Sequence, residues 1–495
     1  MYSPTDRLRS PGSLHALLFA AALIAAMAAH AADLHVRPVA DCVHYGDGTV
    51  ATCATADGAE GAFKGFQDID WGMIQPGDTL YVIGRHEDAL VIGKSGTAAQ
   101  PIAIRGDMPG FAAGSIHGGD TLGICVGDAN HNHLAFAKLE ISHCLNRGLQ
   151  LANDYTNGVR TSGVAIEDVY VHDIAGGGNW PTCIWGYGND VLIRNARIEN
   201  CGDDAIWWTG RNVSVLDNVI VDVGMGPQET GDCVQFGGWS TQFLIAGNFC
   251  DHSRANEKHC YIVAAPDASA YDATASGQVV DNTCLLPPDA GFDTKGIAVD
   301  APNTLIARNF VTGGRFGIFS ADAYIVANVV TQFSTRGINI TAAPTTLRWP
   351  SQVMHNTVLA ASAVGQAPPA YCIHGYDTSA EFANNIAVGC AVGYGGYGTS
   401  SDDVWTHNVS WQHLKNYEFG ATGTHTLTTP IDAMPQFIGN DPHDPSAWQV
   451  LLAIPAKDLT GYAAGNYGPM PLIVDFNANP RPVEPSAGAY EPDGQ

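Results

Sequence analysis

The chain carries a degenerate repeat in which a polar residue, most often asparagine, stands in the pattern apolar-x-x-Asn-x-apolar. Copies recur every 19 to 34 residues, and Lys138 and Asp168 take the polar place in two early copies. The asparagine copies centre on Asn195, Asn218, Asn248, Asn282, Asn309, Asn328, Asn356, Asn385 and Asn408. A repeat of this length predicts one coil of a solenoid per copy, with the variation in length absorbed by loops.

Each copy leads through a loop to a small residue followed by apolar-x-apolar, as at 148–151, 205–208, 296–299 and 337–340. Such alternation predicts short strands with one face turned inward. A propeller would need four strands per unit, and leucine-rich repeats would need a fixed leucine pattern. The repeat therefore predicts an all-β, right-handed parallel β-helix of about eleven or more coils. Coils about 4.8 Å apart would stack equivalent asparagines into a hydrogen-bonded ladder.

Two segments support this with a family resemblance. The opening Ile-Gln-Pro-Gly-Asp-Thr-Leu-Tyr-Val at 74–82 resembles the first coil of the pectate-lyase-like β-helix superfamily. The closing stretch 475–491, with Asn-Pro-Arg-Pro at 479–482 and Gly-Ala-Tyr-Glu at 488–491, is also similar to that superfamily. The resemblance covers about residues 40–491 and implies the fold. It leaves the reaction open, because the superfamily holds lyases, hydrolases, epimerases, tailspikes and adhesins.

The organisation predicted from the sequence has four parts. Residues 1–31 have a basic start, a short apolar run and Ala29-His30-Ala31, which is typical of a signal peptide cleaved near Ala31. We expect a cap at 32–73, the β-helix at 74–420 and a capping segment at 421–495. The expected product is a secreted monomer, extracellular or periplasmic, with no membrane span.

The net charge limits which molecules the chain can bind, and the cysteine content indicates how the chain is cross-linked. A net charge of −26 repels nucleic acid, and it also repels an acidic polysaccharide unless a cation intervenes. Twelve cysteines in an exported chain favour six disulfides over zinc sites, although connectivity stays open. Alignment of the coils suggests the pairs Cys42–Cys53, Cys125–Cys144, Cys183–Cys201, Cys233–Cys260, Cys250–Cys284 and Cys372–Cys390.

Aligning the coils on the apolar-x-apolar strand predicts a ridge of ionisable side chains. Four successive coils place Asp204, Asp232, His259 and Lys295 two residues before the first inward position. Residues immediately before this column add Asp203, Lys258 and Arg315. Carboxylates about 4.8 Å apart repel each other, so their clustering calls for an explanation.

Three explanations are open for the acidic cluster. Asp203, Asp204 and Asp232 could hold Ca²⁺, which prefers several carboxylate oxygens. One aspartate could instead be protonated and act as a general acid. The third explanation is structural, with the aspartates bonding the backbone of turns.

Aromatic side chains are expected beside this ridge. Trp185 and Trp207 share an outward position in adjacent coils, and Gln235 follows them in the next coil. Tyr187 and Trp239 are expected on loops close by. Flat aromatic faces next to polar groups suit stacking on sugar rings. Ordinary stacking between coils is the alternative.

The pattern favours a secreted polysaccharide-degrading enzyme, a Ca²⁺-assisted lyase acting on a uronate-containing polymer. Lys258 is the predicted base, and His259, Lys295, Arg315, Asp204 and Asp232 are the other catalytic candidates. The runner-up is a glycoside hydrolase that uses Asp204 and Asp232 as its carboxylate pair. A non-catalytic glycan-binding adhesin is the third candidate.

Overall fold

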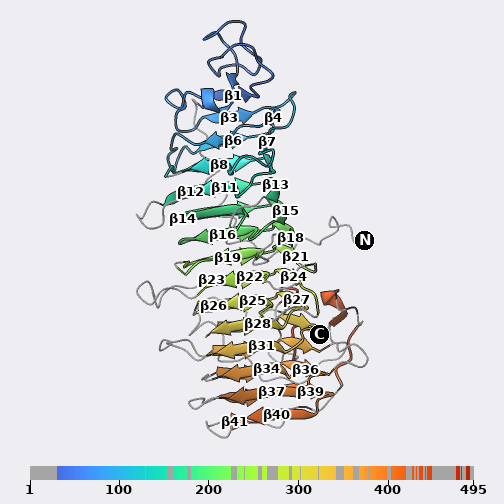
Figure 1. Ribbon diagram of the computed structural model, residues 1–495. Coiled ribbons are helices and arrows are strands. Elements are labelled where there is room, and N and C mark those ends of the chain that lie inside the picture. Colours follow the sequence, from blue (N-terminus) through green and yellow to red (C-terminus); the bar gives the residue numbers. More distant parts are fainter. Residues whose placement is uncertain are drawn as a thin grey trace.

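The computed structural model forms a long column of stacked coils (Figure 1). It describes residues 31–490 except 129, 153–159, 175–179, 225–230, 239, 255–258, 265–276, 289–292, 302, 322, 342–350, 361–366, 377–379, 398–402, 420–425, 428–430, 432–433, 439–440, 442, 449–474, 480 and 482–486. Besides strands, these residues form two short 3-10 helices, η1 (Phe66–Asp68) and η2 (Pro445–Trp448).

Three parallel sheets run along the column, here called sheets I, II and III in the order in which each coil meets them. Sheet I consists of β5 (Leu90–Val91), β8 (Ile124–Asp128), β11 (Arg147–Leu151), β14 (Thr182–Arg194), β16 (Ile206–Thr209), β19 (Val234–Phe236), β22 (Tyr261–Val263), β25 (Lys295–Val299), β28 (Phe316–Ala321), β31 (Arg336–Thr341), β34 (Tyr371–Tyr376), β37 (Val392–Tyr397) and β40 (Lys415–Phe419).

Sheet II shares the long strand β14 with sheet I. Its other strands are β1 (Asp33–Arg37), β2 (Phe63–Lys64), β3 (Thr79–Val82), β6 (Ile102–Arg105), β9 (Leu134–Ala137), β12 (Thr161–Glu167), β17 (Val213–Leu216), β20 (Leu244–Ala246), β23 (Gly277–Val280), β26 (Thr304–Ala307), β29 (Ala323–Val326), β32 (Ser351–Met354), β35 (Ala380–Ala383), β38 (Val404–Thr406) and β41 (Thr426–Leu427).

Sheet III has thirteen strands in the described part of the chain. They are β4 (Arg85–His86), β7 (Ser115–His117), β10 (Glu140–Ser142), β13 (Tyr170–Ile174), β15 (Arg197–Cys201), β18 (Val219–Val223), β21 (Phe249–Asp251), β24 (Thr283–Leu285), β27 (Phe310–Thr312), β30 (Val329–Thr331), β33 (Thr357–Leu359), β36 (Ile386–Val388) and β39 (Val409–Trp411).

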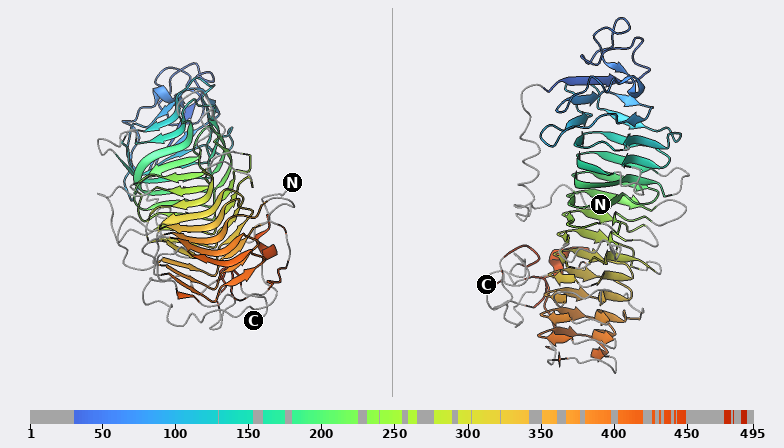
Figure 2. Two further views of the ribbon diagram at one scale, coloured as in Figure 1. Left: turned by 60° about the horizontal axis from the view of Figure 1, so that its bottom comes forward. Right: turned by 90° about the vertical axis from the view of Figure 1, so that its left-hand side faces the viewer.

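One strand from each sheet makes one coil. The chain passes through β19, β20 and β21, and then begins the next coil at β22, which pairs in parallel with β19. Alternate side chains point inward, so β-branched and aromatic residues stack into a continuous core between the sheets. Trp208, one of the largest of these core side chains, is fully buried. The predicted right-handed parallel β-helix is confirmed, and Figure 2 shows its continuous stack of coils.

The asparagine ladder runs between sheets II and III from Asn218 to Asn408. The Nδ2 atom of each ladder asparagine donates to the Oδ1 atom of the next one at 2.8 to 3.0 Å. The backbone N–H of each also donates to that same oxygen, as Asn282 does to Asn309. The ladder thus provides hydrogen-bond partners for backbone groups of the turns, which are not paired within sheet II or sheet III. Each such hydrogen bond contributes about 0.5–1.5 kcal/mol to stability.

The prediction that Lys138, Asp168 and Asn195 belong to this ladder is wrong by one residue. All three have a positive φ, between 52° and 55°, and stand at the turn residue that precedes the ladder position. Strand register places Leu139, Val169 and Ala196 in the ladder column, and all three are buried among apolar side chains. The early coils therefore fill this column with hydrocarbon, where later coils use amides.

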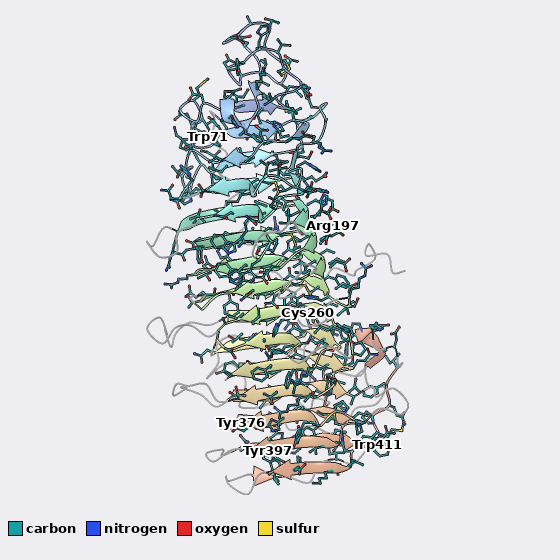
Figure 3. The ribbon with its side chains drawn as sticks, viewed as in Figure 1. Trp71, Arg197, Cys260, Tyr376, Tyr397 and Trp411 are labelled. Atoms are coloured by element: carbon teal, nitrogen blue, oxygen red, sulfur yellow. A yellow bond between two sulfur atoms is a disulfide. The ribbon has the colours of Figure 1, made fainter. Side chains whose placement is uncertain are left out.

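The structure contains six disulfides, as predicted, but two of the suggested cysteine pairs are wrong. The structure pairs Cys233 with Cys250 and Cys260 with Cys284, at Cα–Cα distances of 6.2 and 5.8 Å. Cysteines stacked on adjacent coils point in the same direction, whereas those of one coil face each other across its interior. Figure 3 marks Cys260 within the column. The other pairs are Cys42–Cys53, Cys125–Cys144, Cys183–Cys201 and Cys372–Cys390.

The two ends of the column are built differently. Strand β1, which falls in the predicted cap, already pairs in parallel with β3 in sheet II. Described residues of the C-terminal segment pack on the outer face of sheet III: Tyr490 and Ala489 contact Phe310, Val329 and Leu359. Figure 1 shows an orange-red C-terminal segment beside β27. None of the helices in the described part of the chain is long and apolar enough to cross a membrane.

Candidate functional site

The predicted ridge lies in register on sheet I. Strands β14, β16, β19, β22 and β25 pair so that Ile206, Val234 and Tyr261 stack, with Asp204, Asp232 and His259 two residues before them. Backbone bonds fix the same register, since Ala205 N donates to Asp232 O at 2.9 Å and Cys233 N donates to His259 O at 3.3 Å. The alignment that brought these side chains together is confirmed. Their roles in chemistry remain predictions.

Asp232, His259 and Lys295 form a hydrogen-bonded chain across three coils. The Oδ1 atom of Asp232 lies 3.1 Å from Nδ1 of His259 and also accepts the His259 backbone N–H at 3.0 Å. On the other side of the ring, Nζ of Lys295 lies 3.3 Å from Nε2 of His259. A carboxylate only accepts and an ammonium only donates, so these partners assign the imidazole proton to Nδ1 and leave a lone pair on Nε2.

The two ends of this chain differ in exposure. The Asp232 side chain is 6% exposed, whereas those of His259 and Lys295 are 12% and 16% exposed. Lys295 also donates to Oδ1 of Asp293 at 2.6 Å. His259 and Lys295 are therefore the members within reach of a ligand, and Asp232 orients the imidazole from below.

Asp204 lies one coil before Asp232 and is buried. Burial, followed by the charges of Asp232 and Asp203, raises the pKa of Asp204 well above its usual range. Its Oδ1 atom accepts the backbone N–H of Asp232 at 2.8 Å. Each of these two aspartates thus bonds the backbone of the following coil, which is the structural role that the sequence left open. The charge of Arg147 acts on Asp204 in the opposite direction, and desolvation lowers the pKa of Arg147.

The raised pKa of Asp204 predicts a pH-dependent effect of Asp204→Asn on stability. A carboxyl whose folded-state pKa is raised costs stability as the pH climbs from the usual aspartate range through that pKa. Asparagine keeps the Oδ1 acceptor for Asp232 N–H and does not titrate. We expect the variant to gain stability over wild type progressively above about pH 4. Urea unfolding from pH 4 to 8 measures this, and a pH-independent difference would contradict it.

Possible metal ligands gather elsewhere in the described residues. Two groups of three or more His, Cys, Asp or Glu side chains have ligand atoms within 4.8 Å of one another: Cys233, Cys250 and His252, and Cys372, Cys390 and His413. Their sulfurs are in disulfides, which removes the thiolates. Asp203, Asp204 and Asp232 are hard oxygen donors of the type that suits Ca²⁺, but they are not among these groups. Calcium binding stays a prediction.

The aromatic residues come together as expected. The Trp185 and Trp207 rings stack at 5.4 Å with an interplanar angle of 15°, and Tyr187 contacts both edge-on at 4.8 and 5.0 Å. Tyr187 lies on β14 rather than on a loop, because this strand continues from sheet I into sheet II. Gln235 is the next residue in the same outward row. These side chains are partly exposed and form a surface, here called the tryptophan platform.

Three other predicted residues are placed as follows. Lys258, the predicted base, and Trp239 lie outside the described residues. Arg315 lies at the start of the coil after Lys295, with its guanidinium 5.3 Å from the centre of the Phe316 ring.

Sequence reasoning did not single out two acids that surround Lys295. Asp293 contacts its ammonium directly, and Asp300 lies close enough to Lys295 and His259 for their charges to act on it. Asp293 and Asp300 flank β25 at its two ends. A search of both ends of each ridge strand, instead of one column, would have found them.

Comparison with known proteins supports the fold. No protein-family model matches the sequence, and comparison with curated proteins found no match. XylC, solved in complex with xylose, is 10% identical with a TM-score of 0.52, over 93% of this chain and 98% of XylC. Pectate lyase Pel9A is 11% identical with a TM-score of 0.34, over 94% and 98% of the two chains.

A mannuronic-acid-specific polysaccharide lyase from the human gut microbiota is 12% identical with a TM-score of 0.37, over 68% of this chain and 82% of that one. At such identities, the similarity concerns the path of the chain rather than its chemistry. The chain is a right-handed parallel β-helix, a fold that it shares with XylC.

Proposed function

We propose that the protein is a polysaccharide-degrading enzyme that cleaves a uronate-containing polymer by β-elimination at the His259–Lys295 pair. The observation that carries the proposal is the Asp232–His259–Lys295 chain, which begins one coil beyond Trp207 of the tryptophan platform. A base, a cation and a sugar-stacking surface thus share the outer side of one sheet.

Each residue has a distinct task in this reaction. In the structure, the lone pair on Nε2 of His259 faces the ammonium of Lys295. When a substrate carboxylate draws that ammonium away, the lone pair takes the proton from the carbon next to the carboxylate. The ammonium of Lys295 faces the same point and stabilises the charge that develops on that carboxylate. A double bond forms at that carbon as the glycosidic C–O bond breaks, and the departing oxygen takes up a proton from water. Lys258, the residue before His259, is a second candidate base.

Two features favour elimination over hydrolysis. A hydrolase needs two carboxyl groups that flank the scissile bond. Asp204 and Asp232 are both buried, and each uses an oxygen to hold the next coil. A binding solenoid would not need a base next to a cation. Lys295 supplies a positive charge next to the base. Ca²⁺ at the aspartates, if bound, would add neutralisation of an anionic substrate.

Export fits this function. Six disulfides form and persist in oxidising compartments, which supports an extracellular or periplasmic site of action. The predicted signal peptide falls almost entirely on residues 1–30, outside the described residues. The monomeric state remains a prediction.

A panel of polysaccharides tests the proposal. We expect a uronate polymer to yield products with the ultraviolet absorbance of unsaturated ends. Each assay is run in calcium, in a chelator, and in a chelator followed by excess calcium. Loss and recovery of activity would support the calcium prediction. New reducing ends without the absorbance would replace elimination by hydrolysis, and the absence of any product would remove the proposed function.

A further inference from the structure

The ridge on sheet I continues past Lys295 to a second cationic residue, Arg336. Strands β25, β28 and β31 pair so that Lys295, Phe316 and Arg336 occupy one column. Tyr371 follows in the next coil. Arg336 therefore lies two coils, roughly 10 Å, from Lys295 along the column.

Arg336 is a half-buried cation that forms no ion pair with any described residue. The guanidinium lies 5.9 Å from the Phe316 ring centre and 5.8 Å from that of Tyr371. Desolvation lowers the pKa of Arg336, and the nearby charge of Arg315 lowers it further. Carboxylates are abundant in a chain of net charge −26, yet none in the described part of the chain forms an ion pair with Arg336. An uncompensated, partly desolvated cation is costly, and an anionic ligand removes that cost.

A neutral network holds the guanidinium in place. Oδ1 of Asn339 accepts from Nη1 of Arg336 at 2.8 Å and lies 3.0 Å from Nδ1 of His374. Asn339 and His374 are each 1% exposed. Burial, and then the charge of Arg336, lowers the pKa of His374 to about 3, so the imidazole is neutral at working pH. The network orients Arg336 without cancelling its charge.

Within the described residues, the polar atoms of this network that lack a hydrogen-bond partner are mostly donors. Nε of Arg336 and Nδ2 of Asn339 have no hydrogen-bond partner within the described part of the chain, and neither does Nε2 of His374. Next to the network, the hydroxyl of Tyr371 donates to that of Tyr397 at 3.0 Å. Figure 3 shows Tyr376 and Tyr397 on adjacent coils of this face, and Tyr376 is 50% exposed. Aromatic rings thus accompany the cation, as at the tryptophan platform.

We propose that Arg336 binds an anionic group, a carboxylate or a sulfate ester, on a sugar unit two coils beyond the His259–Lys295 pair. The inference rests on the proposed function and defines its substrate: a polymer that carries negative charge at more than one unit. Arg336 contacts the ligand, whereas Asn339 and His374 are positioning residues.

Binding is measured on the full mature chain carrying His259→Ala, so that no substrate is consumed. Calorimetric titration uses oligogalacturonate, oligoguluronate, a sulfated carrageenan oligosaccharide and neutral xylo-oligosaccharide. Arg336→Met is expected to weaken binding of at least one anionic probe by about tenfold or more and to leave the neutral probe unaffected. Which anionic probes respond distinguishes carboxylate from sulfate ester.

Asn339→Asp separates recognition from folding. It keeps the shape of the network but places a carboxylate against Arg336, so anion binding should fall as in Arg336→Met while the melting temperature holds. The control Arg308→Met removes a guanidinium that is paired with Asp281 at 2.7 Å on another face, and should leave binding unchanged.

Equal binding by wild type and Arg336→Met, or equal losses for neutral and anionic probes, would overturn the inference. Anion binding that depends on Arg336 in a protein that cleaves nothing would uphold it and reject the proposed function.

Discussion

Replacing His259 with alanine is expected to lower kcat on the cleaved polymer by about 10²- to 10⁴-fold, the range for loss of a positioned general base. The reason is geometric, because Asp232 fixes the imidazole proton on Nδ1 and directs the lone pair of Nε2 toward Lys295. KM should change little, since the tryptophan platform and Arg336 are untouched. Initial rates from the absorbance of unsaturated ends measure both constants.

A control histidine and a neighbouring lysine make this result decisive. His172 is also partly buried and bonded to an acid, Asp173, at 2.7 Å, but it lies on sheet III. His172→Ala should retain full activity. If His259→Ala retains activity while Lys258→Ala loses it, the base is Lys258, as the sequence predicted.

Asp232→Asn should shift the pH profile of kcat, because it removes the charge that holds the imidazole while keeping an acceptor.

Replacing Asn309 with alanine is expected to destabilise the protein by about 2–4 kcal/mol. Asn309 takes part in four bonds of the ladder: its Oδ1 accepts from Asn282 N and Nδ2, and its Nδ2 donates to Val279 O and Asn328 Oδ1. Alanine leaves buried partners on both neighbouring coils unsatisfied, at about 1–3 kcal/mol for each group that finds no other partner. Urea unfolding followed by far-ultraviolet circular dichroism measures the loss.

The matched control for Asn309 is Asn195→Ala. Asn195 fits the same sequence pattern, but it is exposed and occupies the turn position with φ of 52°. Only the cost of a positive φ applies there, about 1–2 kcal/mol or less. Equal destabilisation at the two positions would show that the ladder hydrogen bonds add no stability beyond that of an exposed asparagine in a turn. Because a solenoid can unfold coil by coil, the urea midpoint of Asn309→Ala should be measured with spectroscopic probes at both ends of the column.

Local patterns in the sequence were enough for the fold and for the ridge. Inward positions alternate with period two, and stacking repeats that pattern at every coil, so register follows from hydrophobicity alone. The column from Asp204 through Asp232 and His259 to Lys295 could be read for this reason, because each of its members is fixed two residues before a buried apolar residue.

The sequence could not decide which side chains meet across the interior of a coil. It also could not decide which residues outside the aligned column make contact. Cys233 meets Cys250 because they face each other through the core, which no spacing rule distinguishes from stacking on Cys260. The ladder begins at Asn218 because earlier coils bury leucine, valine or alanine at the same position, and only backbone conformation separates turn from ladder.

The support of Arg336 by Asn339 and His374 likewise joins side chains from two coils whose intervening loop length is not encoded in the repeat. The sequence by itself therefore determined which residues stack, because stacking obeys a local period. The tertiary structure alone decided which side chains meet across that stack, because those distances depend on how each coil closes.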